Sequence, residues 1–115
     1  MKLAAVRKFA LALPEVTEEP HFHLTSFRVR GKIFVTAPTE GTHLHVFVDD
    51  VLRGPALTAH GDFIEKLLWG GKVCGLRIAL AAAKPAVVDN LVRAAWEAKA
   101  AKSTLAKSAK RAKKK

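Results

Sequence analysis

The residues whose types most clearly indicate a chemical role are the cations at the carboxyl end of the chain. The last seventeen residues, Lys99 to Lys115, contain eight cations and no acid. These cations are Lys99, Lys102, Lys107, Lys110, Arg111, Lys113, Lys114 and Lys115. The chain has 20 cations and 10 acids, so residues 1–98 hold the other 12 cations and all 10 acids, and the end carries +8 of the net charge of +10. A block of one sign attracts polyanions, and its cations can displace the counterions of nucleic-acid phosphates.

Two interpretations of this basic tail (residues 99–115) compete. The tail can bind a polyanion, or it can be a disordered end that keeps the protein in solution. Solvated charge runs usually mix both signs, and this run does not, so we favour polyanion binding. Phosphate contacts carry no base code, so we expect a weak sequence preference, and the pattern does not separate DNA from RNA.

A second group of cations lies on predicted strands. Side chains alternate along a strand, so Phe27 and Val29 are expected to face the helices and Arg28 and Arg30 the other side. The cations expected on the face away from the helices are Arg28, Arg30, His43, His45 and Arg77. With Phe47 beside them, this face resembles surfaces that bind single-stranded nucleic acid. An ordinary solvated sheet face is the alternative that we favour, and its three arginines remain candidate nucleic-acid contacts.

Two His-x-His pairs and one cysteine are the other reactive groups. In a strand, His21/His23 and His43/His45 would each point two imidazoles the same way, as a metal site requires. No acid or cysteine completes either set nearby in the sequence, so we interpret them as surface histidines. Cys74 lies in a predicted strand, where a small buried hydrophobic residue is the usual role. We therefore predict no catalytic residues, no metal, no cofactor and no enzymatic activity.

The bulk composition restricts the class of protein. A chain of 115 residues that is 50% hydrophobic forms one domain with a modest core. One cysteine allows no internal disulfide and favours a reducing compartment. No apolar run approaches the roughly 18 residues of a membrane span, and Arg7 and Lys8 interrupt the first apolar stretch too early for a signal peptide. We expect a cytoplasmic monomer that does not enter a membrane.

The first half of the chain predicts a helix followed by strands. Apolar residues at helical spacing predict a helix over residues 3–13, and Pro14 ends it because the residue before a proline leaves the α region. Residues 15–20 are expected to form an acidic connector. A tight turn at Arg30-Gly31 then joins two strands of a three-stranded meander. The three predicted strands are Phe27–Val29, Lys32–Thr36 and His43–Val48.

The second half predicts two more helices and a hairpin. Asp49 and Asp50 are good N-caps for a short helix, which Gly54-Pro55 interrupts and Gly61 ends. Gly70-Gly71 favours a hairpin between residues 63–69 and 73–78. Pro85 opens the last helix, and its apolar stripe stops at Trp96. Alanine and lysine favour a continuation of this helix into the tail, whereas repulsion between the lysines and the lack of a packing face favour fraying.

These elements together predict an α+β fold. Their order is helix, three-stranded antiparallel meander, short helix, two-stranded hairpin and long C-terminal helix. We expect a five-stranded antiparallel sheet with the helices on one face. Residues 1–98 are expected to form the domain and residues 99–115 the basic tail.

Several segments of the chain resemble the MmcQ/YjbR family of small bacterial proteins. The segments that carry the resemblance are the hairpin Ser26–Phe34, the preceding Leu13–Glu19, the turn Trp69-Gly70-Gly71 and a closing helix rich in valine and leucine. The resemblance implies a CyaY-like fold, a twisted antiparallel sheet with helices on one side, and a description as DNA-binding that rests more on fold than on chemistry. His21–Thr25 departs from the Gly-His-Pro-like segment expected there. The basic tail departs too, and resembles the tails of histone-like bacterial proteins.

The combined interpretation is a non-enzymatic nucleic-acid-binding protein. DNA is the expected partner, bound through its phosphates by the tail. A protein- or small-ligand-binding module is the alternative, in which the open sheet or a groove beside Trp69 is the site and the tail only solubilises.

Overall fold

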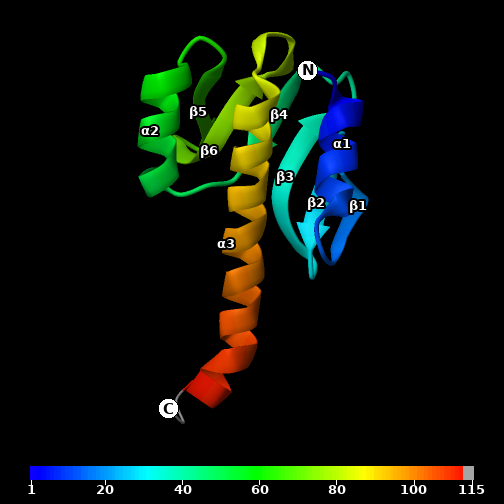
Figure 1. Cartoon of the computed structure of the whole chain (residues 1–115), viewed down its shortest axis with the longest axis vertical. Helices are drawn as coiled ribbons and strands as arrows, with labels where there is room; N and C mark the ends of the chain where they lie inside the picture. The colour runs from blue at the N-terminus through cyan, green and yellow to red at the C-terminus, as the bar shows by residue number, and fades with distance from the viewer. Residues whose placement is uncertain (113–115) are drawn as a thin grey trace.

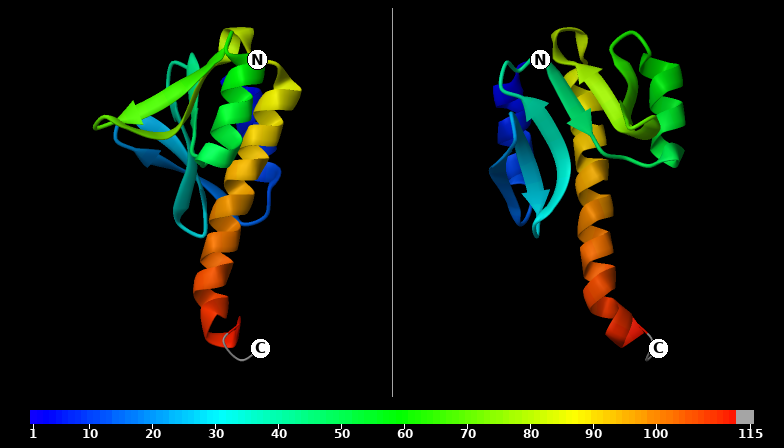
Figure 2. Two further views of the ribbon diagram at one scale, coloured as in Figure 1. Left: turned by 90° about the vertical axis from the view of Figure 1, so that its left-hand side faces the viewer. Right: turned by 180° about the vertical axis from the view of Figure 1, so that it is seen from behind.

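The described part of the protein is an α+β structure in which three α-helices cover one face of an antiparallel sheet. The computed structural model describes residues 1–112, and their side chains through residue 101. The sheet has six strands in the order β1-β2-β3-β4-β6-β5. Figure 1 shows α1, α2 and α3 in front of the strands, and the turned view in Figure 2 shows the two layers edge-on. The predicted fold class is confirmed, with one more strand than expected.

Helix α1 (Leu3–Ala12) opens the chain and ends as its sequence predicts. It turns Val6 and Ala10 into the core. Leu13 follows with an extended backbone, ψ 146°, because Pro14 excludes the α region at that residue.

Strand β1 (Val16–His21) corrects the prediction of an acidic connector. It pairs with β2 along its whole length, from Val16 opposite Val29 to His21 opposite Leu24. The sequence concealed this strand because its two central residues, Glu18 and Glu19, are acidic and Pro20 interrupts it. An edge strand tolerates both, since one side needs no ladder hydrogen bond and is open to water.

Strands β2 (Leu24–Val29), β3 (Lys32–Pro38) and β4 (His43–Val46) complete the meander. Arg30 and Gly31 form the predicted two-residue turn with φ of 52° and 81°, the left-handed pair that such a hairpin needs. Only two residue pairs join β3 to β4, Val35 with Val46 and Thr36 with His45. Strand β4 therefore ends two residues earlier than predicted.

Helix α2 (Asp50–His60) is capped by Asp49, whose carboxylate accepts a hydrogen bond from the Leu52 N–H at 3.4 Å. The predicted interruption at Gly54-Pro55 is wrong, because the helix continues through Pro55. Pro55 lacks the N–H that would bond the carbonyl of Val51. Both residues lie on the exposed side of the helix, where water can take the place of that N–H.

The predicted hairpin is confirmed as β5 (Ile64–Trp69) and β6 (Lys72–Ala79). Gly70 and Gly71 turn with φ of 59° and 80°. Strand β6 also pairs with β4, which joins the hairpin to the meander. Gly75 permits this pairing, because a Cβ there would lie 2.3 Å from the carbonyl oxygen of Val46.

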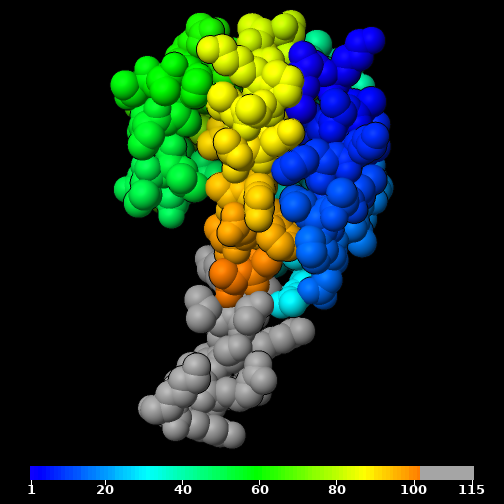
Figure 3. All heavy atoms as spheres, viewed as in Figure 1, coloured from blue at the N-terminus to red at the C-terminus, as the bar shows by residue number. Residues whose placement is uncertain are grey.

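Helix α3 (Pro85–Ala112) follows the short 3-10 helix η1 (Leu80–Ala82) and begins at the predicted proline. Val88, Val92 and Ala95 are fully buried against the sheet. The space-filling view shows α3 lying between α1 and α2 (Figure 3). Of the two outcomes weighed for the tail, the backbone follows the continued helix as far as Ala112.

Two phenylalanines five residues apart test this fold. Phe27 is buried in the core, whereas Phe22 is 89% exposed. We expect Phe27→Ala to lower the free energy of unfolding by about 3–5 kcal/mol, as for other large aromatic truncations in a core. Phe22→Ala, the matched control, should change it by about 0.5 kcal/mol or less. Urea unfolding measures both, and equal losses would contradict the assignment of the core.

Candidate functional site

A row of polar side chains crosses all six strands on the face away from the helices. Its members lie opposite one another at successive strand pairs: Glu19, Ser26, Thr36, His45, Arg77 and Glu65. We call this set the transverse row. The alternation predicted for His45 and Arg77 is confirmed, since their neighbours Leu44, Val46, Leu76 and Ile78 are buried on the helix side.

Hydrogen bonds join the six members of the row in three pairs. The Ser26 hydroxyl donates to the Glu19 carbonyl at 2.7 Å, and the Thr36 hydroxyl lies 3.1 Å from Nδ1 of His45. Arg77 donates to the Glu65 carboxylate at 2.7 Å. Ser26 and Thr36 are 0% and 1% exposed, although no helix covers this face. Other side chains of the same face therefore enclose the middle of the row. This part of the face is shielded from water, unlike the ordinary solvated face that we favoured.

Burial favours the neutral form of His45. It lowers the pKa of the imidazole, and the nearby positive charges of Arg77 and His43 lower it further. A neutral imidazole offers one donor and one acceptor, and the tautomer decides which nitrogen is which. The Thr36–His45 pair can therefore present either polarity to a ligand.

The three candidate arginines are engaged within the protein. Arg30 donates to the Glu15 carboxylate at 2.7 and 2.9 Å, and Arg77 binds Glu65. Arg28 donates to the Ser26 hydroxyl at 3.0 Å and to the Pro20 carbonyl at 3.4 Å. These contacts leave the sheet face with less uncompensated positive charge than a count of its arginines suggests.

The predicted pairing of Arg28 and Arg30 on one face needs a correction. Strand β2 ends at Val29, and Arg30 lies in the turn with φ 52°. Strand alternation does not extend into a left-handed turn residue. The guanidinium of Arg30 lies against Glu15, before β1, while that of Arg28 lies over Ser26.

Beside the row lies a hollow with aromatic walls. Its volume is about 210 Å³, and the residues that line it are His21, Ile33, Thr36, Phe47, Trp69 and Lys99. We call it the aromatic hollow. The rings of Phe47 and Trp69 meet edge to face with centroids 5.3 Å apart, and Trp69 is 50% exposed. Lys99, the first cation of the basic tail, reaches this hollow from α3, a proximity that the sequence did not reveal.

The exposed Phe22 is a feature that sequence reasoning missed. It lies in the turn between β1 and β2 with φ 60°, a conformation that costs a non-glycine residue free energy. Its ring meets that of His21 edge-on at 4.7 Å. The unusual His-Phe-His run was the available signal. His21 ends β1 while His23 lies in the turn, so the strand geometry supposed for this pair as metal ligands does not hold.

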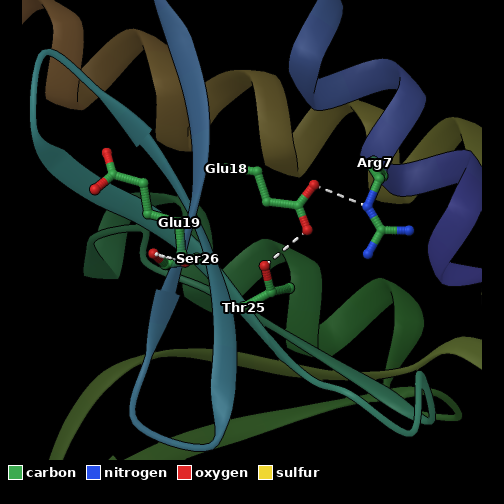
Figure 4. Close-up of polar contacts among 5 residues, drawn as sticks. All are labelled: Arg7, Glu18, Glu19, Thr25 and Ser26. Atoms are coloured by element: carbon green, nitrogen blue, oxygen red, sulfur yellow. Dashed lines mark hydrogen bonds and ion pairs between the residues drawn. The ribbon is translucent and has the colours of Figure 1, made fainter.

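Glu18 and Glu19 point to opposite faces of β1 (Figure 4). The Glu18 carboxylate accepts hydrogen bonds from Nε of Arg7 and from the hydroxyl of Thr25, each at 2.8 Å. The contact with Arg7 is the main cause that lowers the pKa of Glu18. This cluster ties α1 to the meander, and the alternation along β1 keeps the Glu19 carboxylate away from it.

Cys74 and the remaining tail cations complete the set of predicted residues. Cys74 is half-buried, its thiol donates to the Leu67 carbonyl at 3.6 Å, and burial raises its pKa. A protonated thiol is a poor nucleophile.

Most of the candidate tail cations lie outside the described residues. This holds for the side chains of Lys102, Lys107, Lys110 and Arg111, and for all atoms of Lys113–Lys115. In the described part, no helix has the length and apolar character needed to span a membrane.

Removal of the Glu18 carboxylate should change the pH dependence of stability. The pKa of Glu18 is lower in the folded protein than in the unfolded chain. The stability that its carboxylate contributes is therefore present above the ordinary pKa of about 4.3, and it is lost as the pH falls through the folded pKa. We expect wild type to be more stable than Glu18→Gln at pH 7, with the difference shrinking toward pH 3 in urea titrations. Glu19→Gln removes the same charge from the other face of β1. An identical pH profile for the two variants would contradict the role of Arg7.

His45 should titrate below the ordinary histidine value of about 6.5, as followed by NMR of its ring signals. In Arg77→Gln its pKa should rise but remain below that value, because burial is the larger cause. A pKa of His45 at or above the ordinary value in wild type would show that the row is open to water.

Known proteins resemble the chain at the level of family and fold. The YjbR family model matches residues 11–98, more than half of the chain. The crystal structure of Deinococcus radiodurans protein DR2400, with a DUF419 domain, has a TM-score of 0.72 at 16% identity over 83% of this chain and 75% of that chain. At this identity, the likeness concerns the fold alone. Among curated proteins, none matches. The extent of the family match confirms the resemblance seen in the sequence: the chain belongs to the YjbR family.

Proposed function

We propose that this protein binds nucleic acid, DNA in the first place, without catalysing a reaction. One observation carries the proposal: the basic tail holds +8 of the net charge of +10 and contains no acid. Phosphates are the polyanions that such a run binds, through counterion release and with little regard to base sequence. The ion pairs of Arg30 and Arg77 add support, because they offset positive charge that the sheet face would otherwise offer to a phosphate.

The folded body holds the start of the tail in place. The part of α3 that precedes the tail is buried against the sheet, and Nε1 of Trp96 donates to the Pro14 carbonyl at 3.0 Å. Lys99 follows three residues later on the same helix. The tail therefore continues from a fixed helix rather than from a loop, which gives bound nucleic acid a defined approach to the body.

A binding module for a protein or a small ligand is the second candidate. The aromatic hollow favours it, since half-exposed Trp69 and Phe47 form a ready apolar surface. In that case the tail only solubilises. A cytoplasmic location, a monomeric state and the CyaY-like relationship stay predictions.

The salt dependence of binding tests the tail. We expect the full-length protein to bind a fluorescein-labelled DNA duplex with log K falling against log salt at a slope of about −4.5 to −7, for roughly five to eight phosphates neutralised. The comparison variant replaces the seven cations after Ala101 with glutamine and keeps every described side chain. Its slope should be far shallower in fluorescence anisotropy.

The design separates charge from fold. Ala100 packs against the core and Lys99 lines the hollow, so the substitutions begin beyond both. Circular dichroism and the thermal midpoint of the variant should match wild type. An unchanged slope in a folded variant would reject the tail as the binding element.

A further inference from the structure

Two large aromatic side chains are exposed at hairpin turns, Phe22 to 89% and Trp69 to 50%. Phe22 occupies the β1–β2 turn, where its left-handed backbone is costly, and Trp69 is the last residue of β5. Exposed aromatic rings gain nothing from burial in the folded protein, and clusters of them mark binding sites. His21, which contacts Phe22, lines the same hollow as Trp69, so residues from both hairpins reach one place.

The size of the aromatic hollow restricts its ligand. Drug-sized ligands occupy pockets of about 300–1,000 Å³. At about 210 Å³, this hollow suits a single flat heterocycle better than a peptide or a large cofactor. The edge-to-face pair of Phe47 and Trp69 leaves part of the indole free to stack.

The polar groups of the hollow suit a base of either hydrogen-bonding pattern. Thr36 lines the hollow and shares a hydrogen bond with His45. The hydroxyl can donate or accept, and the neutral imidazole can follow by changing tautomer. Because Thr36 is 1% exposed and His45 does not line the hollow, this pair contributes little to the choice of base, as expected of a site that binds many sequences.

The positive charge at the hollow indicates the kind of molecule that carries the heterocycle. Lys99 lines the hollow and begins the basic tail, and none of the described residues that line the hollow is acidic. An uncharged heterocycle could accept a hydrogen bond from Lys99, but it would form no ion pair with this cation or with the seven that follow. A base attached to a phosphate backbone fits both the aromatic wall and the tail, whereas a base stacked inside a duplex cannot enter the hollow.

We propose that the aromatic hollow binds one unstacked base of a single-stranded nucleic acid against Trp69, while Lys99 in its wall binds an adjoining phosphate. This inference rests on the proposed function and adds a preference for single strands. Base stacking on one aromatic side chain accounts for a preference of roughly 5- to 150-fold.

Anisotropy titrations with labelled dT12 and a 12-base-pair duplex test the proposal on the full-length protein. Trp69→Leu should weaken dT12 binding by roughly 5- to 150-fold and leave duplex binding unchanged. Trp69→Phe, which keeps a ring, should retain most of the affinity for dT12. Leu68→Ala is the matched control, because Leu68 is also more than half exposed but its side chain alternates to the other face of β5. It should bind both probes as wild type does.

The fluorescence of Trp69 gives a readout independent of affinity. In a Trp96→Phe background, Trp69 is the one remaining tryptophan. Stacking of a base should quench its emission on addition of dT12, and the duplex should quench it much less. If a free nucleoside quenches the emission of Trp69 and dT12 does not, the hollow is a site for a small ligand and the proposal is overturned.

The outcomes separate this inference from the proposed function. If neither probe binds with salt dependence, nucleic-acid binding itself fails. If both probes bind but Trp69→Leu weakens neither, or weakens both equally while its thermal midpoint is unchanged, the hollow does not bind a base and the tail remains the binding element.

Discussion

The short strand β4 is the constraint on which the rest of the structure depends. Its four residues pair with β3 on one side and with β6 on the other, and so join the meander and the C-terminal hairpin into one sheet. The junction is close: Gly75 has no side chain where the carbonyl of Val46 passes. Any larger residue at position 75 would push the two strands apart. The core under α3 and the transverse row both cross this junction.

The end of β4 also creates the aromatic hollow. Beyond Val46 the chain leaves β6, and Phe47 keeps one backbone hydrogen bond, to Phe34 on β3, at 3.1 Å. The strands of the meander and those of the hairpin diverge from there, as seen from behind in Figure 2. The ring of Phe47 meets Trp69 of β5 across this divergence. A sheet paired along its full length would have had no hollow at this place.

Positive charge is distributed differently in the folded body and in the basic tail. In the body, arginines pair with nearby acids, as Arg7 does with Glu18 and Arg77 with Glu65. Pairs as exposed as these contribute little to stability, but they reduce the charge that the sheet offers to a partner. The tail contains no acid. Under the proposed function, the tail would attract a polyanion at long range, and the sheet face where the tail begins would make the short-range contacts.

The sequence by itself determined the elements whose signals are local. Pro14 and Pro85 set one end each of α1 and α3, Gly31 and Gly71 mark the hairpin turns, and period-two alternation placed His45 and Arg77 on one face. These signals act through the backbone conformation of one or two residues, so no distant partner is needed to interpret them. The charge of the tail is equally local, being a matter of composition.

Only the tertiary structure decided what depends on pairing between distant segments. β1 carries no strand pattern and is a strand because β2 supplies its hydrogen bonds. The pairing of β4 with β6, which completes the transverse row, involves residues about thirty positions apart. The aromatic hollow draws on four elements, β1, β3, β5 and α3, and on the segment after β4, and both Lys99 and Trp69 line it. No periodicity encodes such meetings, because they follow from how the sheet twists and where its pairing stops.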